Sequence, residues 1–97
     1  MRHYEMMVVL DAELEDDAVE MSTKKIETLI PKYQGTIDKV DKLGKRRLAY
    51  EIKHKREGNY SIYYFHGDET EVHEIERALN ITDEIIRFGI YRLPEKK

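Results

Sequence analysis

The chain has no cysteine and no long apolar run. The absence of cysteine excludes disulfides, thiolate-bound metals and thiol nucleophiles, and it is compatible with a reducing compartment. No apolar run approaches the ~18 residues that a membrane-spanning helix needs, and the first residues follow a strand-like pattern instead of that of a signal peptide. We therefore expect a cytoplasmic protein without a membrane partner.

The balance of charges is acidic overall but basic in the middle of the chain. Its 97 residues predict one domain, 1–97, and 40% apolar residues suffice for one core. The net charge of -3 argues at first against a nucleic-acid partner, because phosphate binding depends on lysine and arginine. Residues 39–56, however, contain eight basic and two acidic residues, a net +6, which leaves -9 on the remainder. Such a local positive field can attract a polyanion.

Two periodic segments open the chain. Apolar side chains alternate over residues 4–10, which predicts a strand whose even-numbered side chains face the core. Apolar residues then recur at helical spacing over residues 18–33, after an acidic stretch that suits the positive end of a helix dipole. Pro31 predicts a kink or an early stop of this helix, and Gly35 predicts the end of the segment.

A hairpin is predicted next. Residues 36–53 are long for one strand, and only their second half keeps a period of two, so Gly44 should mark a bend or bulge. Residues 55–58 have the composition of a turn, and residues 60–66 have the pattern of a returning strand. The segment therefore predicts two paired strands.

A short helix and a last strand complete the order. Asp68 is a candidate N-cap with Glu71 three residues later, Asn80 is a candidate cap at the other end, and residues 86–91 alternate as a strand. Strand, helix, strand, strand, helix, strand, joined by two right-handed crossovers, predicts an α+β fold of the ferredoxin-like split βαβ type. In this fold (β-α-β-β-α-β) a four-stranded antiparallel sheet carries two helices on one face.

The sheet face without helices is predicted to be apolar, whereas such faces are usually polar. Bulky side chains occupy both alternating phases of residues 60–65, so some must face outward. A contiguous apolar patch often marks a partner site, although exposed tyrosines covered in part by lysine or arginine stems would also explain it. Stacking of RNA bases is a weaker alternative, because residues 57–64 match the RNA-recognition consensus poorly. The mixture suits a protein interface, whose predicted residues are Met7, Val9, Tyr60, Ile62, Tyr64 and Tyr91.

The predicted hairpin concentrates the positive charge. Its cations are Lys45, Arg46 and Arg47 on one strand and Lys53, Lys55 and Arg56 near the tip. Groups that project from both sides of a strand pair suit a phosphate backbone. An edge strand that charge keeps soluble would show the same residues. Charge alone leaves both interpretations open.

Two exact motifs carry a family resemblance. Residues 43–52, Leu-Gly-Lys-Arg-Arg-Leu-Ala-Tyr-Glu-Ile, resemble the central motif of the sixth small-subunit protein of bacterial ribosomes, the ribosomal protein S-six family, and residues 1–5, Met-Arg-His-Tyr-Glu, resemble its opening. The resemblance extends to about Arg92, although Glu51 stands where family members often have proline. It implies a ribosomal protein that binds the central domain of small-subunit ribosomal RNA as a heterodimer with ribosomal protein S-eighteen. The RNA-binding residues that it implies are Arg2, Tyr4, Lys45, Arg46, Arg47 and Arg87.

Signatures of catalysis and cofactor binding are absent from the sequence. The four histidines lack metal-ligand spacing within any single element, so no metal is expected. The sequence has no P-loop, dinucleotide fingerprint or nucleophile elbow, so we expect no enzyme, no cofactor and no small-molecule substrate. Two alternatives remain. One is a ferredoxin-like regulatory or ligand-binding module that homodimerises through its open face; the other is an acylphosphatase-like enzyme, although acidic residues 10–15 would repel its phosphate.

Overall fold

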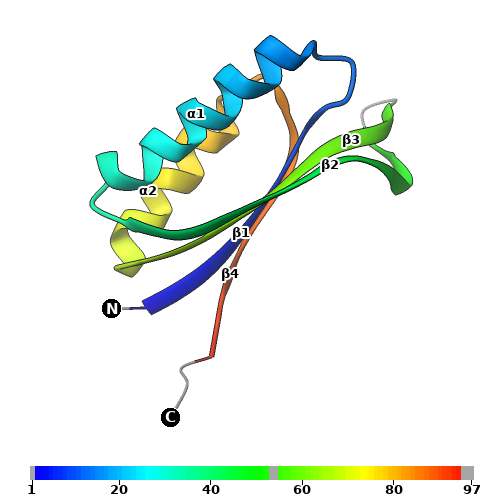
Figure 1. Cartoon of the computed structure of the whole chain (residues 1–97). Coiled ribbons are helices and arrows are strands. Elements are labelled where there is room, and N and C mark those ends of the chain that lie inside the picture. The colour runs from blue at the N-terminus through cyan, green and yellow to red at the C-terminus, as the bar shows by residue number, and fades with distance from the viewer. Residues whose placement is uncertain (1, 53–54, 95–97) are drawn as a thin grey trace.

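The helices and strands follow the predicted order. The computed structural model describes residues 2–52 and 55–94, without the side chains of Ala49 and Ile52. Its elements are β1 (Arg2–Asp11), α1 (Asp16–Lys32), β2 (Thr36–Ile52), β3 (Lys55–Gly67), α2 (Glu69–Asn80) and β4 (Ile85–Arg92). The strands form one antiparallel sheet in the order β2-β3-β1-β4, and both helices cover the same face (Figure 1). The predicted ferredoxin-like sandwich is confirmed.

The main core lies between the sheet and the two helices. Met6 and Val8 of β1 are 0% exposed, as the alternation of this strand predicts. They belong to one cluster with Ile30 of α1 and Ile75 of α2. Tyr63 of β3, opposite Met6, is also buried, and burial raises its pKa to about 12 because a phenolate there would lose its hydration. Within the described residues, no helix is long and apolar enough to cross a membrane.

Helix α1 ends as predicted, before Gly35. It continues one residue past Pro31, and the left-handed backbone that follows, with φ of 68°, belongs to Gln34. Gly35 donates its N–H to the Ile30 carbonyl at 2.8 Å, and a Cβ at this position would lie 2.9 Å from the Ile30 side chain. The glycine is therefore needed for close approach to the helix.

Helix α2 begins where its capping residues predict. Asp68 is the N-cap, and its N–H donates to the Glu71 carboxylate at 3.0 Å. This reciprocal arrangement is a capping box, which satisfies donors that the first turn leaves without a partner. At the other end Asn80 is still helical and Ile81 is the cap, so the predicted cap at Asn80 is wrong by one residue.

Strand β2 carries two bulges, which explain why its apolar period breaks. Its register against β3 shifts at Asp38, between Ile37 and Lys39, and again between Lys42 and Gly44. Gly44 has φ of 79°, so the predicted bulge at this glycine is confirmed. The bulge at Asp38 was not predicted. An extra residue at a bulge changes which face later side chains occupy.

The predicted turn over residues 55–58 is wrong, because β3 already begins at Lys55, which pairs with Ile52. Gly58 lies inside the strand. A Cβ at this position would lie 2.2 Å from Cγ1 of Val9 and 3.5 Å from Cδ2 of Leu48. The glycine therefore permits close packing of neighbouring strands and does not form a turn.

Gly44→Ala should lower the free energy of unfolding by about 1 kcal/mol. A Cβ at Gly44 would meet nothing within 4 Å, so the cost comes only from the backbone conformation with φ of 79°. Urea unfolding measures the effect. Leu43→Ala is the control, because Leu43 is 41% exposed and should change stability by less than about 0.5 kcal/mol. Equal stability of Gly44→Ala and wild type would contradict the prediction.

Candidate protein and nucleic-acid interface

The open face of the sheet carries a partly exposed apolar strip. We use this name for Met7, Tyr60, Ile62, Tyr64 and Tyr91, all predicted interface residues. The strand register brings them onto one face, because Met7 pairs with Ile62 in β3 and with Gly89 in β4. Tyr91 is 52% exposed, and its ring occupies space that a side chain at Gly89 would need, since a Cβ there would lie 2.6 Å from the Tyr91 hydroxyl. The strip therefore offers a nearly continuous apolar surface.

Val9 differs from the other predicted interface residues. It faces the same side of the sheet but is only 1% exposed, because it packs with Leu48 of β2 and Ile86 of β4. This second small core lies on the face opposite the helices, and Tyr60 packs against it. Val9 can thus support the apolar strip from below but offers almost no surface of its own.

The end of the β2–β3 hairpin reaches across the open face to β4. Strands β2 and β4 are the two outer strands, yet the Tyr50 hydroxyl of β2 accepts a hydrogen bond from Arg87 of β4 at 2.7 Å. The Arg87 guanidinium also lies 5.9 Å from the centre of the Tyr50 ring. The contact places the predicted RNA-binding Arg87 at the hairpin end of the sheet. Tyr50, 61% exposed, was not among the predicted site residues, and only its spacing from Leu48 pointed to it.

Lys45, Arg46 and Arg47 lie exposed on β2, beside the apolar strip. Arg46 pairs with Gly58, whose face is that of Val9, so Lys45 and Arg47 occupy the opposite phase. Among the residues that the structure describes, none of the three forms an ion pair. These cations, accessible from both sides of one strand, could grip a phosphate backbone. Because β2 is an outer strand, the solubility interpretation also remains consistent with the structure.

Lys55 is partly neutralised by the loop after β1. Its Nζ lies 2.9 Å from the Glu13 carboxylate and 3.4 Å from that of Asp11. The hydrogen bond to Glu13 chiefly raises the pKa of Lys55. The pKa of Asp11 is lowered, first by the Glu13 backbone N–H and then, despite some burial, by Lys55. The predicted tip cation Lys53 lies outside the described residues.

Arg2 and Tyr4 lie far from the basic hairpin. Arg2 pairs with Gly67 and Arg46 pairs with Gly58, nine positions apart on β3, or roughly 30 Å along the strand (Figure 1). Arg2 binds the Glu69 carboxylate at 2.6 Å, and this hydrogen bond is the main cause of a raised pKa for Arg2. Tyr4 is 5% exposed and stacks on Phe65. The structure therefore separates the predicted RNA-binding residues into two groups.

Known proteins match this chain over nearly its whole length. A family model described as Ribosomal protein S6 matches residues 3–92. The small ribosomal subunit protein bS6 of Symbiobacterium thermophilum is 45% identical over 95 residues, 98% of this chain and 100% of that protein. The bS6 protein of Arthrobacter sp. is 44% identical over 97 residues, 100% of this chain and 96% of its own. A crystal structure of 30S ribosomal protein S6 from Thermotoga maritima has a TM-score of 0.91 and 34% identity, covering 95% of this chain and 87% of that one.

Proposed function

The chain belongs to the ribosomal protein S6 family, and we propose that it binds the central domain of small-subunit ribosomal RNA as a heterodimer with ribosomal protein S-eighteen. It is a protein of the small ribosomal subunit, and its relatives are structural components and not enzymes. Its place of action is the ribosome in the cytoplasm. The RNA contacts and the protein partner are the proposed part.

One observation carries the proposal. Cations without ion-pair partners in the described chain, Lys45 to Arg47, lie directly beside an apolar strip that neither helix covers. Phosphate contacts fix the position of a protein on RNA without depending on base identity. An apolar strip with aromatic residues is typical of the core of a protein interface. The two surfaces therefore suit two different partners that bind side by side.

The boundary between the two surfaces lies near Tyr60. This residue belongs to the apolar strip and pairs with Gly44, next to the basic residues of β2. Arg87 contributes a further cation at the same end, held by Tyr50. We assign Lys45, Arg46, Arg47 and Arg87 to ribosomal RNA and the strip to ribosomal protein S-eighteen, with Val9 as its support.

Arg2 and Tyr4 would form a second, separate RNA contact. Because Arg2 already binds Glu69, it must exchange that carboxylate for a phosphate. Such an exchange returns less free energy than the binding of an unpaired arginine, since one charged partner replaces another. Buried Tyr4 would act through its position next to Arg2, where it also helps to raise the pKa of that residue. The hairpin end is therefore proposed as the main RNA contact.

Reconstitution from purified components tests the proposal. The chain, ribosomal protein S-eighteen and a transcript of the central domain are combined, and filter binding and sedimentation are measured over a range of salt concentrations. We expect an equimolar protein pair that binds this transcript more tightly than unrelated RNA of equal length, with affinity that falls as salt rises. A chain that forms only homodimers and binds both RNAs equally would support the regulatory module instead.

A further inference from the structure

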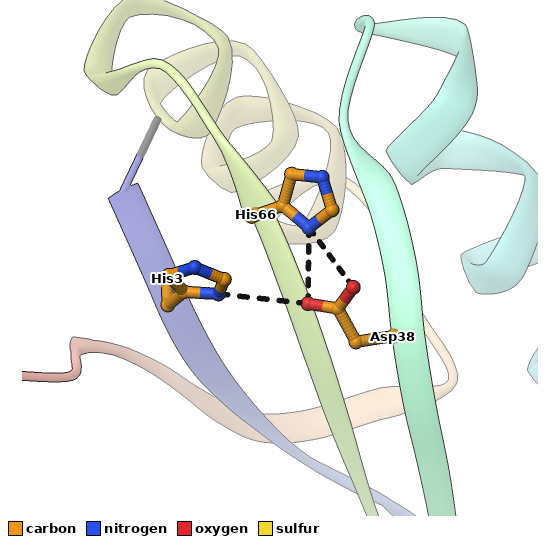
Figure 2. A group of neighbouring side chains, drawn as sticks. All are labelled: His3, Asp38 and His66. Carbon is orange, nitrogen blue, oxygen red and sulfur yellow. Dashed lines mark hydrogen bonds and ion pairs between the residues drawn. The ribbon is translucent and has the colours of Figure 1, made fainter. Parts of the chain in front are cut away.

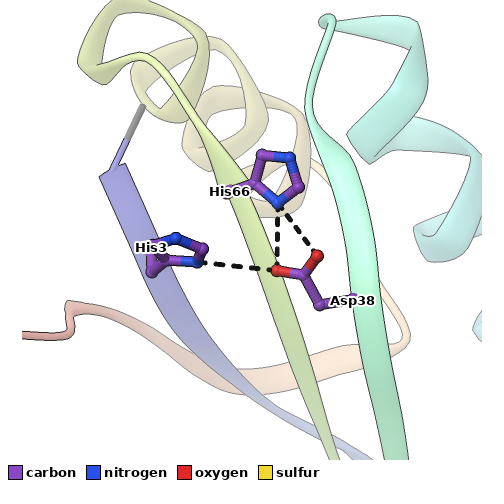
Figure 3. Close-up of polar contacts among 3 residues, drawn as sticks. All are labelled: His3, Asp38 and His66. Atoms are coloured by element: carbon purple, nitrogen blue, oxygen red, sulfur yellow. Dashed lines mark hydrogen bonds and ion pairs between the residues drawn. The ribbon is translucent and has the colours of Figure 1, made fainter. Parts of the chain in front are cut away.

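Three side chains that could bind a metal ion meet at the N-terminal end of β1. They are His3 of β1, Asp38 of β2 and His66 of β3, and their nearest ligand atoms all lie within 4.8 Å of one another (Figure 2). Nδ1 of His66 lies 2.9 Å and 3.0 Å from the two carboxylate oxygens of Asp38, and Nδ1 of His3 lies 3.7 Å from one of them (Figure 3). The carboxylate thus lies between two imidazoles.

The strands themselves bring these residues together. His3 and His66 are direct partners in the antiparallel register of β1 and β3, and their ring centres lie 5.4 Å apart. Asp38 comes from β2, on the other side of β3, at the bulge between Ile37 and Lys39. Without this extra residue the carboxylate would not share a face with both histidines, because strand residues alternate between faces. The cluster therefore depends on three rigid strands.

We propose that His3, Asp38 and His66 form a binding site for a divalent transition-metal ion of the Zn²⁺ class. Imidazole nitrogen and carboxylate oxygen are common zinc ligands, and two histidines with one carboxylate form a known three-ligand set with an open fourth position. The side chain of His66 is 23% exposed, that of Asp38 40% and that of His3 55%, so an ion can enter from solvent. A water molecule or a group from a partner would complete the coordination.

The observed separations are close to those that a metal would impose. Zinc binds nitrogen and oxygen at about 2.0–2.1 Å in a tetrahedron, which places neighbouring ligand atoms about 3.3 Å apart. The pair His66 and Asp38 is now 2.9 Å apart and must open slightly, whereas His3 at 3.7 Å must approach. Side-chain rotations suffice for these changes because all three residues retain solvent exposure. The strand backbones can stay in place.

Isothermal titration of the untagged chain with Zn²⁺ tests this site. We expect one bound ion per chain for the wild type. His3→Ala, His66→Ala and Asp38→Asn should each weaken Zn²⁺ binding by more than roughly tenfold, since loss of even an outer-shell partner has an effect of that size. Asp38→Asn keeps the size of the side chain and removes its charge, so it tests the ligand set even if a histidine variant fails to fold.

His73→Ala is the matched control, because His73 is exposed on α2 and outside the cluster. It should bind Zn²⁺ as the wild type does. Absence of Zn²⁺ binding by the folded wild type, or wild-type affinity in His66→Ala or Asp38→Asn, would overturn the site. So would loss of binding in His73→Ala. The site stands apart from the proposed ribosomal function, because the titration uses the chain alone and needs neither RNA nor a protein partner.

Discussion

Arg46→Ala combined with Arg47→Ala should reduce the affinity for the central-domain RNA by roughly thirtyfold at about 0.15 M salt. If each arginine holds one phosphate, the logarithm of affinity loses about 0.9 of salt slope per contact, on the scale of duplex DNA. At about 0.15 M salt each contact then contributes a factor of roughly 5.5 through counterion release. The salt slope should fall by about 1.8 at the same time. Filter binding at several salt concentrations measures both quantities.

Lys24→Ala combined with Lys25→Ala is the control, because it removes the same charge from exposed positions on α1. If overall charge alone attracted the RNA, both double variants would lose affinity equally. Specific contacts at the hairpin predict that only the arginine variant changes the slope. An unchanged slope in Arg46→Ala with Arg47→Ala would exclude these two residues as phosphate contacts and favour a role in solubility for β2.

Much of the fold could be predicted because local rules and the global fold agree. The alternation in β1, the acidic start of α1 and the capping pair Asp68 and Glu71 each depend on neighbours in the chain, and each was confirmed. The turn over residues 55–58 was predicted from composition, which cannot distinguish a glycine in a turn from one that packs tightly. The packing of Gly58 against Val9 depends on a neighbouring strand, so it is a tertiary fact.

The surfaces were predictable as residue types but not as arrangements. Alternation correctly placed Val9 on the open face, yet its burial requires Leu48 and Ile86 from the two outer strands. Likewise Arg2 and Arg46 share a charge, but only the strand register shows that they lie at opposite ends of the sheet.

The histidine cluster shows the same limit of sequence reasoning. Metal-ligand spacing within one element was rightly found absent. His3 and His66 nevertheless meet across two strands, and the bulge that adds Asp38 leaves only a broken apolar period in the sequence. Spacing along the chain detects ligands within one helix or loop, whereas ligands on neighbouring strands are separated by whatever length the connections have.

Ile62→Asp should weaken binding to ribosomal protein S-eighteen by at least about a hundredfold while the domain stays folded. Ile62 lies at the centre of the apolar strip, opposite Met7 on β1, and it is only half-buried, so the free chain can hydrate a carboxylate there. In the heterodimer the same carboxylate would be buried without a partner charge, which costs several kcal/mol. Sedimentation of the mixed proteins measures the pairing, and circular dichroism checks the fold.

Ile81→Asp is the matched control for Ile62→Asp. Ile81 is 82% exposed at the end of α2, on the helix side of the molecule, so the same substitution adds the same charge away from the strip. It should leave pairing unchanged. If both variants pair normally, the strip is not the partner site, and its tyrosines are exposed because their hydroxyls tolerate water. If only Ile62→Asp fails, the unpartnered face and the basic hairpin serve different partners, since Arg46 and Arg47 are intact in this variant and its RNA salt slope should persist.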